Sequence, residues 1–283
     1  MEVFHGLQVG FAFGMRAAGL ESERESKEAV RRVKMLVQVS LLTGLAVLGG
    51  MGCAQTAAAP APNDAEKQIA AMQVKLNDWA QLGHYREANK ALAPAATGED
   101  RVVFLGASMM EFWGRDGSIF FPEKPYVNRG VSGQTTPQML ARFRQDVINL
   151  HPKVVVILGG GNDVAGNTGP MTPEMTENNW QSMADLAREN GIKVVFASLT
   201  PTTDFPWRKG LHPADKIRAL NAWLQGFCAS HGLVYLDFYS ALTNDEGGMK
   251  AEYTVDGVHA SVKGYEVMTP LAQAAIDKAL GHK

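Results

Sequence analysis

Four short segments of the 283-residue chain carry side chains whose types and order suit acyl transfer. That chemistry needs a nucleophile, a base, a group that orients the base, and donors aimed at the developing oxyanion. Ser108 is the candidate nucleophile and His259 the candidate base, with Asp256 as the carboxylate that orients it. The backbone N–H groups of Ser108 and Gly133 and the side-chain amide of Asn162 are the candidate oxyanion-hole donors. Together these residues predict nucleophilic catalysis at a serine.

Each of these motifs has a simpler interpretation when it is taken alone. A serine after a strand is often a helix cap, and a lone histidine is often structural. The turn Gly159–Gly161 could cradle a phosphate, but Val164 stands where a dinucleotide fingerprint needs its third glycine, and no Walker lysine follows. The nucleophile elbow G-x-S-x-G fails as well, because Met110 replaces its last glycine. Only the combination of motifs favours acyl transfer.

Short apolar runs alternate with amphipathic stretches from residue 101 onward, which predicts strands joined by helices. Thr136-Pro137 and Thr172-Pro173 place an N-cap before a proline, and Gly191 and Gly232 mark helix ends. The five expected strands are 102–105, 126–131, 154–158, 194–198 and 233–236. They predict one α/β domain whose parallel sheet is covered on both faces. Ligands of such sheets bind beyond the carboxyl ends of the strands, where the candidate residues stand.

The ordered blocks Gly-x-Ser, Ser-Gly-Gln-Thr, Gly-x-Asn-Asp and Asp-x-x-His resemble those of the SGNH hydrolases of the GDSL lipase/acylhydrolase superfamily. The similarity is close in VVFLGAS, NRGVSGQTT, GGGND and DGVHASVKGYEVMTPLA. It implies a flavodoxin-like three-layer α/β/α sandwich with a five-stranded parallel sheet, and ester hydrolysis without a metal or other cofactor. The resemblance assigns Ser108 as nucleophile and Gly133 and Asn162 as oxyanion-hole donors. It assigns Asp256 and His259 as the remaining members of a catalytic triad.

One residue departs from the first block of the family, which usually reads Gly-Asp-Ser, because this chain has Ala107. The aspartate of that block is not the triad acid in the family, so its absence removes no reacting group. We expect instead that the loop around Ser108 is held less rigidly and that activity is modestly lower.

Composition excludes several other classes of protein. The 27 Lys and Arg against 29 Asp and Glu give a net charge of −2, which leaves no basic excess for binding nucleic acid. Two cysteines cannot build a disulfide scaffold, and no His/Cys cluster has the spacing of zinc ligands. We therefore expect no metal, no cofactor and no nucleic-acid partner.

Residues 1–53 are expected to be an N-terminal extension and export signal. Three basic residues between positions 31 and 34 precede an uncharged segment, Met35–Cys53, in the layout of a secretory signal. Cys53 follows glycine as in the lipobox of bacterial lipoproteins, so it is a candidate lipid attachment site and membrane tether. Cleavage without lipid near Ala54 and a retained transmembrane anchor are the alternatives. The prediction is an exported protein that is periplasmic, extracellular or lipid-anchored at the cell envelope.

The remaining chain divides into three parts. Residues 54–62 are rich in Ala and Pro and indicate a linker. Residues 63–100 are expected to be an N-terminal helical segment packed on the domain, because Ile69, Met72, Leu76 and Trp79 have helical spacing. Residues 101–283 then form the hydrolase-like domain.

The leading interpretation is an exported serine esterase that removes a short acyl or acetyl group from a lipid, glycan or small ester through an acyl-enzyme. Trp113, Phe205 and Trp207 flank the expected site and are candidates for its substrate pocket, although such aromatic residues often pack in cores. The alternative is a weakly active or inactive protein of this fold that binds glycan or lipid, which Ala107 motivates. A phosphate or nucleotide binder that uses Gly159–Gly161 is a third interpretation.

Overall fold

Five strands form one parallel sheet in this protein, whose computed structural model describes residues 63–282. Their spatial order is β2-β1-β3-β4-β5, and every neighbouring pair is parallel. The strands are β1 Val102–Gly106, β2 Tyr126–Gly130, β3 Val154–Leu158, β4 Lys193–Ala197 and β5 Val234–Leu236. The apolar runs of the sequence thus located all five strands, with ends that differ by no more than one residue.

The order of the strands reverses between β1 and β3, and this reversal determines where a ligand can bind. From β1 the chain passes to β2 on one side and then crosses to β3 on the other. The connections after β1 and β3 therefore diverge and leave a crevice at the carboxyl ends of these two strands. Ser108 follows β1 and Asn162 follows β3, so both candidate residues lie at this switch point.

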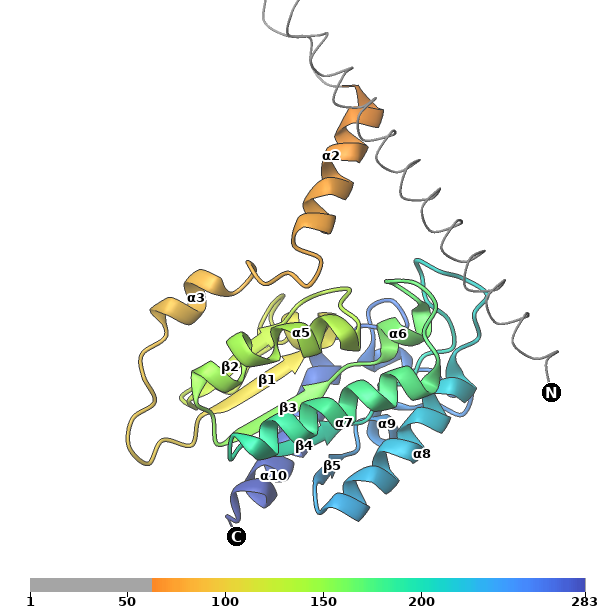
Figure 1. Ribbon diagram of the computed structural model, residues 1–283. Coiled ribbons are helices and arrows are strands. Elements are labelled where there is room, and N and C mark those ends of the chain that lie inside the picture. The colour runs from red at the N-terminus through yellow and green to blue at the C-terminus, as the bar shows by residue number, and fades with distance from the viewer. Residues whose placement is uncertain (1–62, 283) are drawn as a thin grey trace, which may run out of the picture. The chain divides into compact units, whose positions relative to one another are not determined.

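Helices cover both faces of the sheet, which confirms the expected three-layer α/β/α sandwich (Figure 1). One face is buried by α5 Thr136–Asp146, α7 Pro173–Glu189 and α8 Ala214–His231. The other face is buried by α10 Val262–Leu280, together with the short helices α4 Ser108–Glu111 and α9 Tyr239–Leu242. The central strands are apolar throughout because successive side chains enter two different cores. The short elements α6 Gly161–Ala165, η1 Ile148–Leu150 and η2 Ala251–Tyr253 complete the domain.

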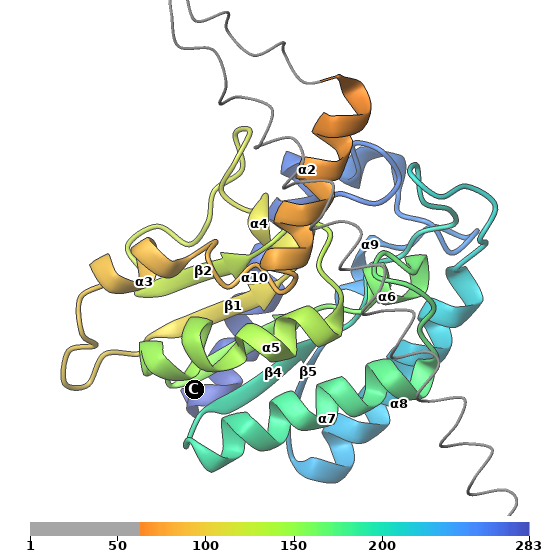
Figure 2. The same ribbon diagram turned by 45° about the horizontal axis from the view of Figure 1, so that its top comes forward.

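The N-terminal segment forms two helices rather than the single one that its apolar spacing suggested. They are α2 Asp64–Asn77 and α3 Arg86–Ala91, and α3 lies beside β2 and α5 (Figure 2). Ile69, Met72 and Leu76 remain 65%, 61% and 72% exposed on α2, so the apolar stripe is not what joins this segment to the domain. Glutamine side chains make the join instead, since the amides of Gln134, Gln138 and Gln145 donate to the backbone carbonyls of Ala80, Trp79 and Leu82.

The first turn of α5 begins one residue earlier than the Thr-Pro signal indicated. Thr135 is the N-cap and forms a capping box with Gln138, whose side chain accepts the Thr135 N–H at 3.0 Å. Thr136 cannot serve as the cap because its hydroxyl donates to the buried carboxylate of Asp163. The second signal was correct, since Thr172 caps α7 and its hydroxyl accepts the Met175 N–H at 3.3 Å.

Several sequence predictions fall on residues that the structure does not describe. The export signal in residues 1–53, the lipid attachment at Cys53 and the linker in residues 54–62 all lie outside the described residues and stay predictions. Within residues 63–282, no helix combines the length and apolarity that crossing a bilayer requires.

A fully buried ion pair on α5 holds the loops of the crevice together. Arg142 pairs with Asp146 at 3.1 Å, and neither side chain reaches solvent. The same guanidinium donates to the carbonyl oxygen of Gly106 at 3.0 Å and to the Gln134 side chain at 2.6 Å. Asp146 also accepts from the Asn89 amide at 2.6 Å. Each guanidinium nitrogen of Arg142 and each carboxylate oxygen of Asp146 therefore has a hydrogen-bond partner, which is the condition for a buried pair to be tolerated.

We predict that Arg142→Leu lowers the free energy of unfolding by about 3–5 kcal/mol, because it leaves the Asp146 carboxylate buried without its cation. Urea denaturation measures the change. Arg188→Leu is the matched control, because Arg188 pairs with Asp185 on the surface and should contribute less than about 1 kcal/mol. Equal losses for the two variants would contradict the importance of the buried pair.

Candidate active site

Ser108, His259 and Asp256 form a continuous chain of hydrogen bonds. His259 Nε2 lies 2.9 Å from Ser108 Oγ, and His259 Nδ1 lies 2.7 Å from Asp256 Oδ2. With the proton on Nδ1, the imidazole donates to the carboxylate and leaves Nε2 free to accept the serine hydroxyl proton. Ser108 is the first residue of α4, whereas the other two come from the loop before α10. The structure therefore brings together residues 151 positions apart in the arrangement that activates a serine.

The carboxylate of Asp256 is held by its own loop. Its Oδ1 accepts the backbone N–H groups of Val258 at 2.9 Å and His259 at 2.8 Å. Burial by itself would raise the pKa of Asp256, but hydrogen bonds from the backbone and imidazole of His259 and from the backbone of Val258 lower the pKa below its usual 3.8. Asp256 therefore remains ionised at neutral pH and can stabilise a protonated imidazole beside it.

Glycine at position 130 permits close packing between the end of β2 and the helix that begins with Ser108. A Cβ atom on Gly130 would lie 2.2 Å from the backbone nitrogen of Glu111, so no other residue fits without moving α4. On the other side of α4, the buried Tyr265 hydroxyl donates to the Met109 carbonyl at 2.9 Å. The orientation of Ser108 is thus fixed by contacts on both sides of a four-residue helix.

Glu111 supports the site in a way that the sequence reasoning missed. Its carboxylate accepts the Ser132 backbone N–H at 2.6 Å and pairs with Arg115 at 3.0 Å. Burial would raise the pKa of Glu111, but the hydrogen bonds from Ser132 and the nearby Arg115 lower it below its usual 4.5. An ionised carboxylate therefore ties α4 to the loop that contains Gly133. Ala107, the N-cap residue of α4, makes no side-chain hydrogen bond. The side chain that ties α4 to this loop is therefore that of Glu111, the last residue of the helix.

Three N–H groups at the switch point are placed to donate hydrogen bonds to an oxyanion. Within the described residues, neither the Ser108 nor the Gly133 backbone N–H donates to another group of the protein. Gly133 has φ of +77°, a conformation that orients its N–H and that other residues rarely adopt. The Asn162 amide donates one hydrogen to the Gln134 carbonyl at 2.9 Å and keeps its second hydrogen free. These are the three donors that the sequence predicted.

Buried groups of α5 and α7 fix the loop after β3, which carries Asn162. The Asp163 carboxylate accepts the Thr136 N–H at 3.0 Å and the Thr176 hydroxyl at 3.2 Å. Burial raises the pKa of Asp163 despite these hydrogen bonds. The Trp180 indole donates to the Gly159 carbonyl at 2.9 Å. Because α5 and α7 both contact this turn, Asn162 has a rigid base.

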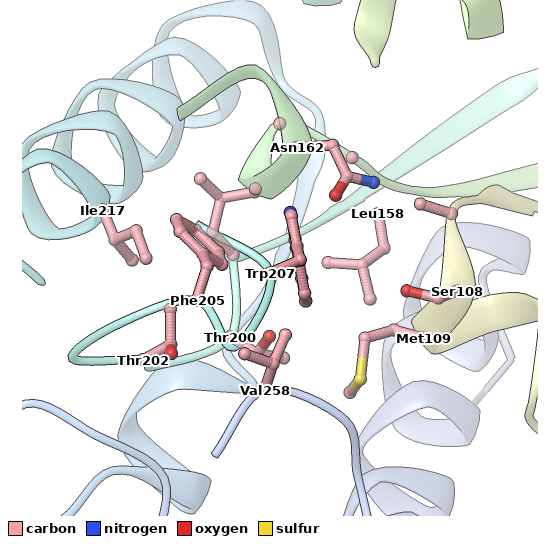
Figure 3. A pocket seen from close by; sticks show the side chains of 15 residues that line it. Ser108, Met109, Leu158, Asn162, Thr200, Thr202, Phe205, Trp207, Ile217 and Val258 are labelled. Carbon is pink, nitrogen blue, oxygen red and sulfur yellow. The ribbon is translucent and has the colours of Figure 1, made fainter. Parts of the chain in front are cut away.

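A small cavity of about 60 Å³ opens beside Ser108 and Asn162 (Figure 3). Phe205 and Trp207 line it, as the sequence predicted, and Figure 3 shows Trp207 between Phe205 and Ser108. Trp113 does not line this cavity. It is 2% exposed and packs in the core against Phe104, because its position on the turn after α4 directs the indole inward. The remaining lining is mostly apolar and includes Met109, Leu158, Leu199, Ile217 and Val258.

A larger cavity of about 740 Å³ lies on the Gly133 side of the site and was not expected from the sequence. It lies between the N-terminal segment and the loops of the domain. Trp79 and His84 line it from the segment, and Gly133, Asn167 and Trp207 line it from the domain. Trp207 therefore borders both cavities. No group of three or more His, Cys, Asp or Glu side chains within residues 63–282 is placed to hold a metal ion.

In sequence, the chain is similar to a known protein family and to a known esterase. The family described as GDSL-like lipase/acylhydrolase matches residues 104–267, which includes Ser108, Gly133, Asn162, Asp256 and His259. Esterase TesA of Pseudomonas aeruginosa is 29% identical over 140 residues, which cover 48% of this chain. The matched region spans only 61% of the length of TesA.

Two solved structures resemble the chain over nearly their whole length. A candidate acylhydrolase from Bacteroides fragilis is 40% identical with a TM-score of 0.70, covering 72% of this chain and 99% of its own. A GDSL-like lipase from Bacteroides thetaiotaomicron is 42% identical with a TM-score of 0.68, covering 71% of this chain and 98% of its own.

We predict that a fluorophosphonate labels Ser108 and that Asp256→Asn slows this labelling by roughly 10²–10⁴-fold, because an amide no longer holds the imidazole in the productive tautomer. Peptide mass spectrometry locates the label. Asp245→Asn is the matched control, since it makes the same change at an exposed aspartate and should label at the wild-type rate. Label on another residue, or wild-type labelling of Asp256→Asn, would refute the assignment of these roles.

Proposed function

The chain belongs to the GDSL-like lipase/acylhydrolase family, and we propose that it is a serine esterase that works through an acyl-enzyme. The observation that carries this proposal is the unbroken hydrogen-bond chain from Asp256 through His259 to Ser108, which ends at a cavity with free N–H donors. A protein that only bound its ligand would have no need for a serine in contact with an oriented imidazole.

The proposed reaction has two halves. Ser108 Oγ attacks the ester carbonyl carbon while His259 Nε2 takes the hydroxyl proton. The carbonyl oxygen becomes an oxyanion that accepts hydrogen bonds from the Ser108 and Gly133 N–H groups and from Asn162. Each such donor typically lowers the barrier by about 3–4 kcal/mol. The tetrahedral intermediate then collapses, His259 gives its proton to the departing alcohol, and the acyl group stays on Ser108. Water, activated by the same imidazole, hydrolyses this acyl-enzyme and releases the acid.

The size of the small cavity supports a short acyl group. One water molecule needs about 10–15 Å³, so about 60 Å³ accommodates a few heavy atoms. Buried side chains line the cavity, among them Phe205 at 2% and Ile217 at 1% exposure. An acetyl group fits such a space, whereas a long fatty acyl chain would need these side chains to move.

The composition of the larger cavity supports a glycan as the alcohol. Two indoles line it, those of Trp79 and Trp207, and they are 46% and 47% exposed. The side chains of Gln81, Gln138 and Asn167 line it as well. Flat aromatic faces cover the C–H face of a sugar ring, and amides exchange hydrogen bonds with its hydroxyl groups.

We predict that the wild-type protein hydrolyses p-nitrophenyl acetate faster than the hexanoate and that Ser108→Ala abolishes this activity, with a loss of at least ~10³-fold. Phe205→Ala enlarges the cavity and should raise the hexanoate-to-acetate ratio of kcat/KM by about tenfold. This ratio does not depend on the fraction of folded enzyme. Phe120→Ala removes a ring that packs against Phe104 and Trp113 and does not line the cavity, so it should leave the ratio unchanged. No hydrolysis by correctly folded wild-type protein would favour the inactive glycan or lipid binder.

We further predict that Trp79→Ala raises KM for an acetylated oligosaccharide about tenfold but leaves p-nitrophenyl acetate unaffected, because only the sugar extends into the larger cavity. Steady-state kinetics on both substrates test this. Leu76→Ala on the same segment is the matched control, since Leu76 is 72% exposed and does not line the cavity. If Trp79→Ala instead impairs only long-chain alkyl acetates, the alcohol is a lipid.

A further inference from the structure

We propose that Asn167 and Trp207 are positioning residues that orient the Asn162 amide toward the oxyanion. The inference rests on the proposed esterase activity and adds to it two residues outside the family's four blocks. Asn167 follows the Gly-x-Asn-Asp block by four residues, and Trp207 lies on the loop between β4 and α8.

The three side chains form a hydrogen-bonded relay. The Trp207 indole N–H donates to Asn167 Oδ1 at 3.1 Å, and Asn167 Nδ2 donates to Asn162 Oδ1 at 2.9 Å. Asn167 Nδ2 also donates to the Gly133 carbonyl at 3.2 Å. The relay therefore contacts both of the predicted oxyanion-hole residues that lie outside α4.

The direction of the relay is fixed at both ends. An indole N–H can only donate, so the Asn167 atom that faces Trp207 must be its oxygen. The Gln134 and Gly133 carbonyls can only accept, so nitrogen atoms must face them. A flipped Asn162 amide would place two oxygens together at Gln134 and two NH2 groups together at Asn167. The relay thus stabilises the one orientation in which Asn162 presents an N–H to the cavity.

Trp207 also connects this relay to the base. Its ring lies 6.1 Å from the His259 ring, tilted by 31°, and 5.2 Å from the Phe205 ring. The loop that carries it is anchored by Arg208, which donates to the carbonyls of Ala165 at 2.6 Å and Gly166 at 2.9 Å. One indole therefore packs beside the imidazole while its N–H donates to Asn167, which contacts the oxyanion donor, so two different effects can be separated by substitution.

The test is a kinetic double-mutant cycle with p-nitrophenyl acetate, which is too small to depend on the larger cavity. Asn167→Asp keeps the shape of the side chain but replaces the donating NH2 group with an oxygen that faces Asn162 Oδ1. We expect kcat to fall about tenfold or more with KM within about twofold, which is part of the 10²–10³-fold loss typical of removing an oxyanion donor. Trp207→Phe keeps a smaller aromatic ring at this position but removes the indole N–H, so kcat should fall about threefold to tenfold.

The double variant decides whether Trp207 acts through Asn167. If it does, the double variant should have the kcat of Asn167→Asp alone, because the indole N–H has no remaining role. Inhibition by a trifluoromethyl ketone, whose adduct carries an oxyanion, should weaken in Asn167→Asp by the same factor as kcat. Asn178→Asp, an identical change at an exposed position on α7, should alter neither quantity.

Two results would overturn the relay while leaving the esterase proposal intact. One is an active wild-type enzyme whose Asn167→Asp variant keeps kcat within twofold. The other is a double variant in which the two single losses multiply, since that would mean independent effects. If wild-type protein shows no hydrolysis, or Ser108→Ala is as active as wild type, the proposed function itself fails. The two hypotheses can therefore be rejected separately.

Discussion

The buried guanidinium of Arg142 is the constraint on which the crevice depends. A charge with no access to water needs hydrogen-bond partners, and two of its three partners, Gly106 and Gln134, belong to the segments that carry the site. One donor group holds the Gly106 carbonyl, two residues before Ser108. Another donates to the side chain of Gln134, whose backbone carbonyl accepts a hydrogen bond from the Asn162 amide. A misplaced α5 would thus disturb the nucleophile and an oxyanion donor together.

The base is positioned by different means. Asp256 and His259 lie three residues apart, and the aspartate accepts two backbone N–H groups of its own loop, so their mutual geometry is local. What must come from tertiary structure is only the distance from this loop to Ser108. The contact between Tyr265 on α10 and the Met109 carbonyl on α4 supplies it, since it joins the helix after the base to the helix of the nucleophile. The donors are therefore fixed from α5 and the base from α10.

The N-terminal segment extends the site instead of the core. The apolar side chains of α2 stay largely exposed, whereas backbone carbonyls of residues 79–82 accept hydrogen bonds from glutamine side chains of the domain. Gln134 takes part in this contact and in the Arg142 network, so the wall of the larger cavity is connected to the oxyanion loop. Trp207 lies where the two cavities meet and contacts the base as well.

The sequence by itself determined the strands and the layers, and it predicted the five residues of the triad and oxyanion hole. Continuous apolar runs identify buried parallel strands, and the residues that follow such strands must gather at one edge of the sheet. Tertiary structure alone decided the rest. Glu111 and Asn167 look like ordinary polar residues until the loops they contact, 21 and 34 positions away, are placed beside them. Trp113 and Trp207 are both indoles near the site, yet one is buried in the core and the other borders both cavities. Composition and spacing cannot distinguish them, because the direction of a side chain depends on packing between segments distant in sequence.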